Sequence, residues 1–179
     1  MPSYSWKARP YMTAIATAAF SDASVRNWLI QGTRFETAYR DAISLHELQA
    51  AIRPGTKSPF YENYWCGKDT RCACKVEGSR AIETDMMIFL ENSGGRRLGI
   101  HIEMKRDGEA LSPGQAETYP RRAACWASPA TRPRRVLPHH EWMTAIFCGD
   151  REIGSPALSP FMRQIGHSEA GRILPEYPA

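Results

Sequence analysis

Long hydrophobic runs are absent from this sequence. The longest uninterrupted stretch of aliphatic and aromatic residues covers only positions 86–90, whereas a helix needs about 20 apolar residues to span a bilayer. No internal repeat or low-complexity tract is visible in the 179 residues, and 42% of them are hydrophobic. These features exclude solenoid and disordered classes. We expect a soluble protein without a membrane partner, a single domain over residues 1–179 with its motif-bearing core at about 32–150.

An even cysteine count, typical of disulfide-paired secreted proteins, is also missing. The five Cys favour free thiols in a reducing compartment, so we expect a cytoplasmic location. The Ala-rich stretch 11–20 follows Lys7 and Arg9 like the hydrophobic segment of a signal peptide. However, it contains Thr and Tyr and lacks Leu and Val, so we interpret it as mature protein.

Three cysteines lie close together in a segment with little predicted structure. Cys66, Cys72 and Cys74 would hold a structural zinc if Cys125, Cys148 or a His supplied a fourth ligand. Their spacing matches no common zinc ribbon, so buried or incidental thiols are the alternative interpretation.

Strong net charge is lacking too, but the charge is unevenly distributed. The formal charge is +4, while residues 121–135 carry five Arg and no acid. A basic stretch in an otherwise slightly acidic chain indicates a polyanionic partner such as nucleic acid, although an Arg-rich solvated loop is the alternative. The candidate nucleic-acid-binding residues are Arg121, Arg122, Arg132, Arg134 and Arg135.

Hydrophobic spacing and capping signals predict a mixed α/β fold. Ser21 or Asp22 would cap a helix to about Ile30, with Gly32 as its stop. Further helices are expected from Thr33 through Ile43, from Ser44 to about Ile52, from Ser112 to a kink or end at Pro120, and around 160–165. Strands are expected over 81–90, 98–105 and 141–148, with residues 54–80 mostly irregular.

The first two strands form a predicted hairpin that brings acidic residues together. Ser93-Gly94-Gly95 supplies the turn, and a turn centred on Gly94 places Asp85 directly opposite Glu103. Two facing carboxylates are destabilising unless something compensates, and Mg²⁺ between them would do so. A solvated hairpin face with a Glu83–Lys105 ion pair is the alternative.

This pattern resembles the core motif of a nuclease superfamily. Asp85, a hydrophobic strand, a turn and Glu103-Met104-Lys105 resemble the D…ExK core of the PD-(D/E)XK nucleases. Gln115 and Tyr119 are similar to the Q-x-x-x-Y element that follows in the lambda-exonuclease and RecB-like branch.

A fourth element precedes the hairpin. Gly32 stands four positions before Glu36, which resembles the first helix of that branch. The resemblance runs from residue 32 to 119 and implies a restriction-endonuclease-like fold, a central mixed β-sheet flanked by helices.

The resemblance also implies a mechanism, a Mg²⁺-dependent (or Mn²⁺-dependent) deoxyribonuclease. Asp85, Glu103 and the carbonyl of Met104 would hold the metal, with Glu36 as an additional acid. Lys105 would orient the attacking water. Gln115 and Tyr119 would contact a phosphate or steady Lys105, although Gln115 also fits a capping box and Tyr119 could be ordinary core.

Two other functions stay open at this point. One is a non-catalytic nucleic-acid or protein-binding module of the same fold, stabilised by zinc through the cysteine loop. The other is a ribonuclease. Ring-forming relatives in this superfamily also make a homo-oligomer an expectation to test.

Overall fold

The computed structural model describes residues 4–55, 57–66, 74, 76 and 83–178, and the side chains from residue 7 onward within these ranges. Its elements, in chain order, are α1 (Tyr4–Ser21), α2 (Ala23–Ile30), β1 (Ile43–Ser44), α3 (His46–Ala51), β2 (Glu62–Trp65), β3 (Glu83–Glu91), β4 (Arg97–Met104), α4 (Gln115–Ala127), β5 (Glu141–Cys148), η1 (Asp150–Glu152), η2 (Pro156–Leu158), β6 (Arg163–Gly166) and α5 (His167–Ile173). No helix in this part of the chain is long and apolar enough to cross a membrane.

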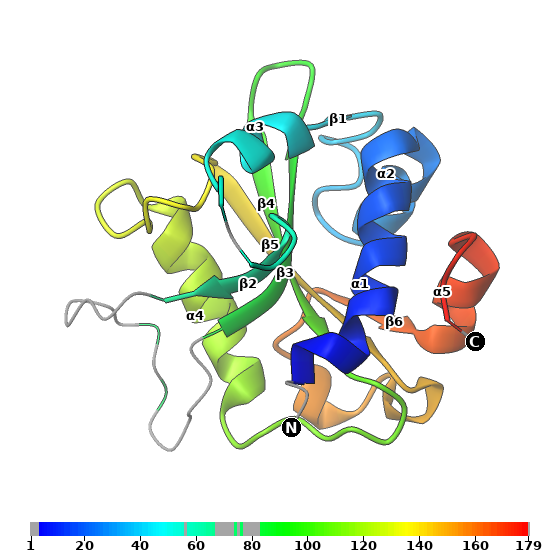
Figure 1. Ribbon diagram of the computed structural model, residues 1–179. Coiled ribbons are helices and arrows are strands. Elements are labelled where there is room, and N and C mark those ends of the chain that lie inside the picture. The colour runs from blue at the N-terminus through cyan, green and yellow to red at the C-terminus, as the bar shows by residue number, and fades with distance from the viewer. Residues whose placement is uncertain (1–3, 56, 67–73, 75, 77–82, 179) are drawn as a thin grey trace.

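Six strands form one mixed sheet. Its main order is β1-β3-β4-β5-β6, and β2 pairs with β3 on the same side as β1. β3 and β4 are antiparallel, whereas β4, β5 and β6 run parallel. Because parallel neighbours need a crossover connection, the chain leaves β4, passes through α4 and returns to start β5. Figure 1 shows α4 on one side of the sheet and α1 and α2 on the other. The fold is therefore mixed α/β, as predicted.

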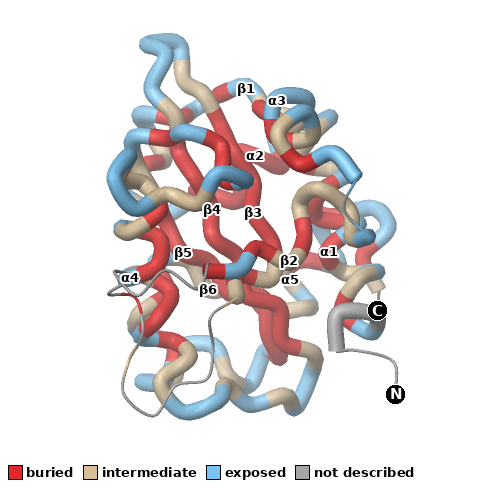
Figure 2. The backbone as a smooth tube through the Cα atoms, turned by 60° about the vertical axis from the view of Figure 1, so that its left-hand side comes forward, coloured by how far each residue is buried: buried red, intermediate tan, exposed pale blue. Residues whose placement is uncertain are grey.

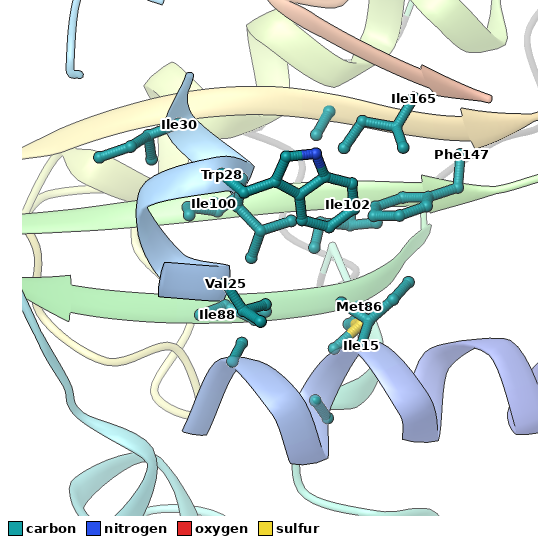
Figure 3. Close-up of a cluster of buried hydrophobic side chains, with 14 of the residues drawn as sticks. Ile15, Val25, Trp28, Ile30, Met86, Ile88, Ile100, Ile102, Phe147 and Ile165 are labelled. Carbon is teal, nitrogen blue, oxygen red and sulfur yellow. The ribbon is translucent and has the colours of Figure 1, made fainter. Parts of the chain in front are cut away.

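The largest hydrophobic cluster lies between the sheet and helices α1 and α2 (Figure 3). Its sheet side consists of apolar residues on alternating positions, including Ile100 and Ile102 of β4 and Phe147 of β5. Met12 and Ile15 of α1 pack against them, so the Ala-rich stretch is part of this core. Figure 2 shows that the central strands are buried along most of their length.

The hairpin between β3 and β4 forms in the predicted register. Met86 pairs with Ile102 and Leu90 with Leu98. Gly95 turns the chain with a φ of 73°, a left-handed conformation that favours glycine. The predicted strand at 141–148 and the Asp22 cap of α2 are also confirmed.

Several predicted elements differ in the structure. The segment after Thr33 forms turns instead of a helix. Phe35 and Tyr39 still pack in the core, whereas Ile43 is exposed in β1. Pro120 does not end α4, which continues to Ala127. The predicted helix at 160–165 is wrong, because these residues lead into β6, and the helix α5 follows it.

Candidate active site

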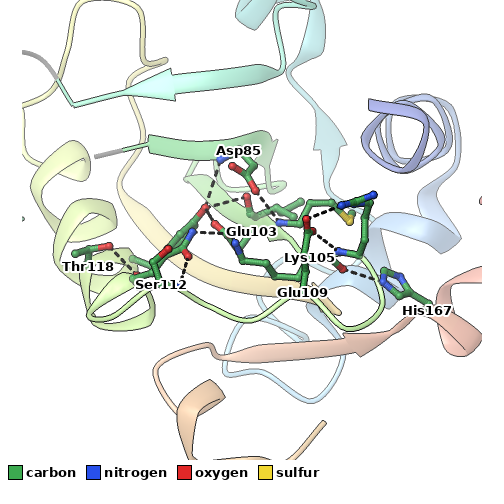
Figure 4. Close-up of polar contacts among 12 residues, drawn as sticks. Asp85, Glu103, Lys105, Glu109, Ser112, Thr118 and His167 are labelled. Carbon is green, nitrogen blue, oxygen red and sulfur yellow. Dashed lines mark hydrogen bonds and ion pairs between the residues drawn. The ribbon is translucent and has the colours of Figure 1, made fainter. Parts of the chain in front are cut away.

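A buried carboxylate at the end of β4 is the centre of the site (Figure 4). Glu103 is 1% exposed. Its Oε1 lies 2.9 Å from Lys105 Nζ and accepts a hydrogen bond of 2.7 Å from Gln115 Nε2. The Tyr119 hydroxyl donates to the other oxygen, Oε2. Lys105, Gln115 and Tyr119, all predicted from the sequence as site residues, therefore contact Glu103, which was predicted with them.

Asp85 completes this group from the neighbouring strand. The β3–β4 ladder ends at Met86 and Ile102, one pair before Asp85. There the Asp85 carboxylate accepts a hydrogen bond of 2.9 Å from the Met104 amide. The Tyr119 hydroxyl lies 3.3 Å from the Asp85 amide nitrogen, so this one phenol contacts both strands that carry the acids.

The electrostatics of the group favour a cation. Burial, together with the nearby charge of Glu103, raises the pKa of Asp85 well above its ordinary value. The same two causes raise the pKa of Glu83 to about 7. Carboxylates gathered in a desolvated place resist ionisation because each charge disfavours the others. The positive charge of Lys105 offsets only part of this repulsion at Asp85.

Gln115 has two roles at the start of α4. Its Oε1 accepts a hydrogen bond of 3.0 Å from the Ser112 amide, but the N-cap of α4 is Gly114, so the predicted capping box from Ser112 does not form. Its Nε2 is the group that binds Glu103. Gln115 therefore links the segment before α4 to the site, and Tyr119, one turn later, is both fully buried and bonded to the site.

Arg122 is buried behind the site and is not on the surface. It is fully buried, its Nε donates to Thr84 Oγ1 at 2.8 Å, and its guanidinium carbon lies 4.6 Å from the centre of the Tyr119 ring. The prediction that Arg122 contacts nucleic acid directly is therefore wrong, because a nucleic-acid chain cannot reach a fully buried side chain. Arg121, by contrast, is exposed on α4.

The rest of the basic stretch lies far from the carboxylates. Arg132, Arg134 and Arg135 follow the end of α4, and the loop that contains them joins the start of β4 through a bond from the His140 amide to the Arg97 carbonyl. Glu103 is six residues further along β4, about 20 Å at 3.3 Å per residue. These three arginines therefore lie away from the site, beyond the end of α4.

Glu36 is also not at the site. Its carboxylate accepts a hydrogen bond of 2.8 Å from the Gly32 amide within the turns after α2. It borders a surface hollow with Trp28 and Arg40, and Trp28 packs in the cluster on the α1 side of the sheet. The turn geometry thus accounts for Glu36 without a metal.

The cysteine loop is only partly described. Cys66 Sγ and Cys74 Sγ are both buried and lie 3.0 Å apart. Cys72, the third residue of the predicted zinc group, is outside the described residues. Cys125 is half-buried and Cys148 is buried.

The donor set of the site fits a hard divalent cation. Asp85 and Glu103 offer carboxylate oxygens, and a cation beside them would relieve the repulsion that raises the pKa of Asp85. Within the described ranges, no three or more His, Cys, Asp or Glu side chains are grouped to hold a metal ion. The other ligands would be the Met104 carbonyl and water, which suits Mg²⁺ because it retains several waters.

One polar contact at the site had no signal in the sequence. His167, at the start of α5, binds the backbone carbonyl of Lys105. The two residues are 62 positions apart, and no local spacing pattern links them.

Comparisons with protein-family models, curated proteins and solved structures found no match to this chain.

Proposed function

We propose that this protein is a nuclease that hydrolyses DNA phosphodiester bonds with a divalent cation, Mg²⁺ or Mn²⁺, on a restriction-endonuclease-like core. The observation that carries the proposal is the convergence of Lys105, Gln115 and Tyr119 on the buried Glu103 carboxylate, beside Asp85. A surface hairpin would not bury these charges, since buried charge is unfavourable unless it is paired or bound to a metal.

The connection of the strands supports the same proposal. An antiparallel β3–β4 pair followed by a parallel β5 places the end of β4 next to the start of α4. Both motif elements, Glu103-x-Lys105 and Gln115-x-x-x-Tyr119, therefore meet at one place on the sheet. This arrangement is the one expected from the resemblance.

The residues have distinct roles in the proposed reaction. A cation held by Asp85 and Glu103 would lower the pKa of a bound water and neutralise charge on the scissile phosphate. Lys105 donates hydrogen bonds from a nearly buried ammonium, so it can orient a water and stabilise charge on phosphate oxygens. Gln115 and Tyr119 hold the Glu103 carboxylate from the α4 side.

The exposed arginines suggest how nucleic acid would lie. Arg121 is exposed on α4, and the arginines at 132–135 are exposed or half-exposed beyond its end. Each duplex strand carries one phosphate per 3.4 Å of helix axis, so arginines beyond the end of α4 would meet phosphates some base pairs from the reacting one. These residues would bind the substrate away from the reacting phosphate.

The test is cleavage of linear and circular DNA in Mg²⁺ or Mn²⁺ by the wild-type chain and by Lys105→Ala. We expect a loss of about 10²–10³-fold in the variant, the usual effect of removing one electrostatic stabiliser. Lys57→Ala is the matched control because it removes the same charge from an exposed position, and it should leave cleavage unchanged.

Three results would contradict the proposal. Cleavage that persists unchanged in Lys105→Ala would show that the active site is not the group around Glu103 and Lys105. DNA binding without cleavage in either metal would favour a non-catalytic module. Cleavage of RNA but not DNA under the same conditions would identify a ribonuclease instead.

A further inference from the structure

A hydrogen-bond chain connects the C-terminal segment to the backbone of Lys105. His167 Nε2 lies 2.8 Å from the Lys105 carbonyl oxygen, and His167 Nδ1 lies 2.7 Å from the Tyr177 hydroxyl. Figure 4 shows the His167 ring directed at the backbone of Lys105, just after the end of β4. The contact therefore reaches the site through the main chain rather than through a side chain.

The chemistry of the groups determines the direction of these bonds. A carbonyl oxygen only accepts, so His167 must carry its hydrogen on Nε2. In the neutral ring Nδ1 is then an acceptor, and the Tyr177 hydroxyl donates to it. Burial raises the pKa of Tyr177, which keeps that hydroxyl protonated. The chain runs from Tyr177 to His167 to Lys105.

Aromatic packing holds the His167 ring in this orientation. The Tyr11 ring, from α1, lies 5.4 Å from the His167 ring and 5.2 Å from the Tyr177 ring, centre to centre. Tyr177 is 8% exposed and belongs to the main hydrophobic cluster. Tyr11, from the other end of the chain, and Tyr177, ten residues after His167, thus fix one imidazole.

Lys105 is a residue whose backbone needs such support. It is the first residue after β4, and its amide donates a hydrogen bond of 2.8 Å to the Phe147 carbonyl of β5. His167 binds its other peptide group. The ammonium sits on a flexible four-carbon stem, so a fixed backbone limits the positions that Nζ can reach around its place 2.9 Å from Glu103.

We propose that His167, oriented by Tyr177, is a positioning residue that holds the Lys105 backbone so that its ammonium stays at Glu103. This inference rests on the proposed nuclease function for its kinetic consequence, although the geometric part does not depend on activity. It assigns a role in the site to α5 and the segment after it.

The kinetic test compares His167→Ala, His167→Gln and Tyr177→Phe with the wild-type chain. We expect kcat to fall 10–100-fold in His167→Ala, as when outer-shell partners of a reactive group are removed, with KM changed less than twofold. His167→Gln should recover most of kcat, because the Gln amide can donate to the Lys105 carbonyl. Tyr177→Phe should lie between these two.

Tyr11→Phe is the matched control. It also removes one phenolic hydroxyl from the aromatic group, but Tyr11 contacts His167 through its ring, and kcat should be unchanged. Equal losses in Tyr11→Phe and Tyr177→Phe, or an unchanged kcat in folded His167→Ala, would overturn the inference.

A second measurement separates this inference from the proposed function. The rate at which a small acylating reagent modifies the Lys105 amine can be followed by mass spectrometry in the absence of DNA, with Lys57 as the internal reference. We expect a several-fold increase in His167→Ala and none in His167→Gln. If the wild-type chain does not cleave but Lys105 becomes reactive in this way, the nuclease proposal fails and the positioning role stands. An unchanged rate overturns the positioning role whether or not the chain cleaves.

Discussion

The two faces of β4 differ sharply in composition. On the face toward α1 and α2, its side chains are all apolar and fully buried, and Ile100 and Ile102 are at its centre. The face toward α4 has Gly99, His101 and Glu103 at the alternating positions. Gly99 leaves room for the His139 ring, because a Cβ at this position would lie 2.9 Å from that ring. One strand thus separates an apolar core from a polar interior.

This difference between the two faces of β4 suggests that one face stabilises the fold and the other holds the candidate site. Burying apolar surface contributes about 25 cal/mol per Å², so the face toward α1 stabilises the fold. Burying Asp85 and Glu103 opposes folding unless they are compensated, and burial beside Glu103 raises the pKa of Asp85. A polar interior of this kind is expected where a site has been retained for function.

The largest effect on stability should come from the apolar face. Ile100→Ala removes a fully buried side chain and should lower the free energy of unfolding by about 2–5 kcal/mol. Urea unfolding at pH 7 measures this change, and cleavage per folded molecule should stay near the wild-type value. A loss below about 1 kcal/mol would show that this face is less important to the fold than its burial indicates.

A smaller effect should appear as a dependence of stability on pH. The pKa of Glu83 is about 7 in the folded protein against an ordinary 4.5, so the folded state holds this proton more tightly than the unfolded chain. Its contribution is complete below pH 4.5 and is lost as the pH rises through 7. Allowing for partial exposure, we expect a decrease of about 1–2 kcal/mol between pH 4.5 and 8.

Urea unfolding in EDTA at these two pH values tests this prediction. Asp85 shifts in the same direction, so Glu83→Gln should reduce the decrease without abolishing it. Addition of Mg²⁺ should restore stability at pH 8, where the carboxylates are ionised. If the free energy of unfolding in EDTA rises with pH, the conclusion that the folded state holds these carboxyl protons more tightly is wrong.

The smallest change in stability, with the opposite sign, should come from Asp85→Asn. The amide keeps an oxygen that can accept from the Met104 amide but carries no charge to repel Glu103. We expect Tm in EDTA at pH 8 to rise by about 3 °C, the equivalent of ~1 kcal/mol at this chain length. Cleavage should fall about 100-fold or more. A lower Tm would indicate that the Asp85 charge stabilises the fold.

The hairpin and its acids could be predicted from the sequence because their signals are local. Two β-prone runs around Ser93-Gly94-Gly95 determine the register, and alternation then assigns each residue to a face. The resemblance predicts that Gln115 and Tyr119 contact a phosphate or Lys105, whereas in the structure both contact Glu103, the ion-pair partner of Lys105.

Other features depend on contacts that no local pattern records. β6 is four residues long and is stabilised by its pairing with β5. The local pattern of the segment 160–165 does not record that pairing and is typical of a helix. Glu36 fits a motif position, but its carboxylate accepts from the Gly32 amide within the turns after α2. The His167 contact joins α5 to a backbone group, which leaves no trace in side-chain spacing.

The two bonds of Gln115 have a mechanical consequence. One amide group joins Ser112, at the end of the 106–114 connection, to the carboxylate at the centre of the site. A movement of that connection, for example when a ligand presses on it, would pull on Glu103 through a single side chain. The position of the Glu103 carboxylate is therefore coupled to that connection through Gln115.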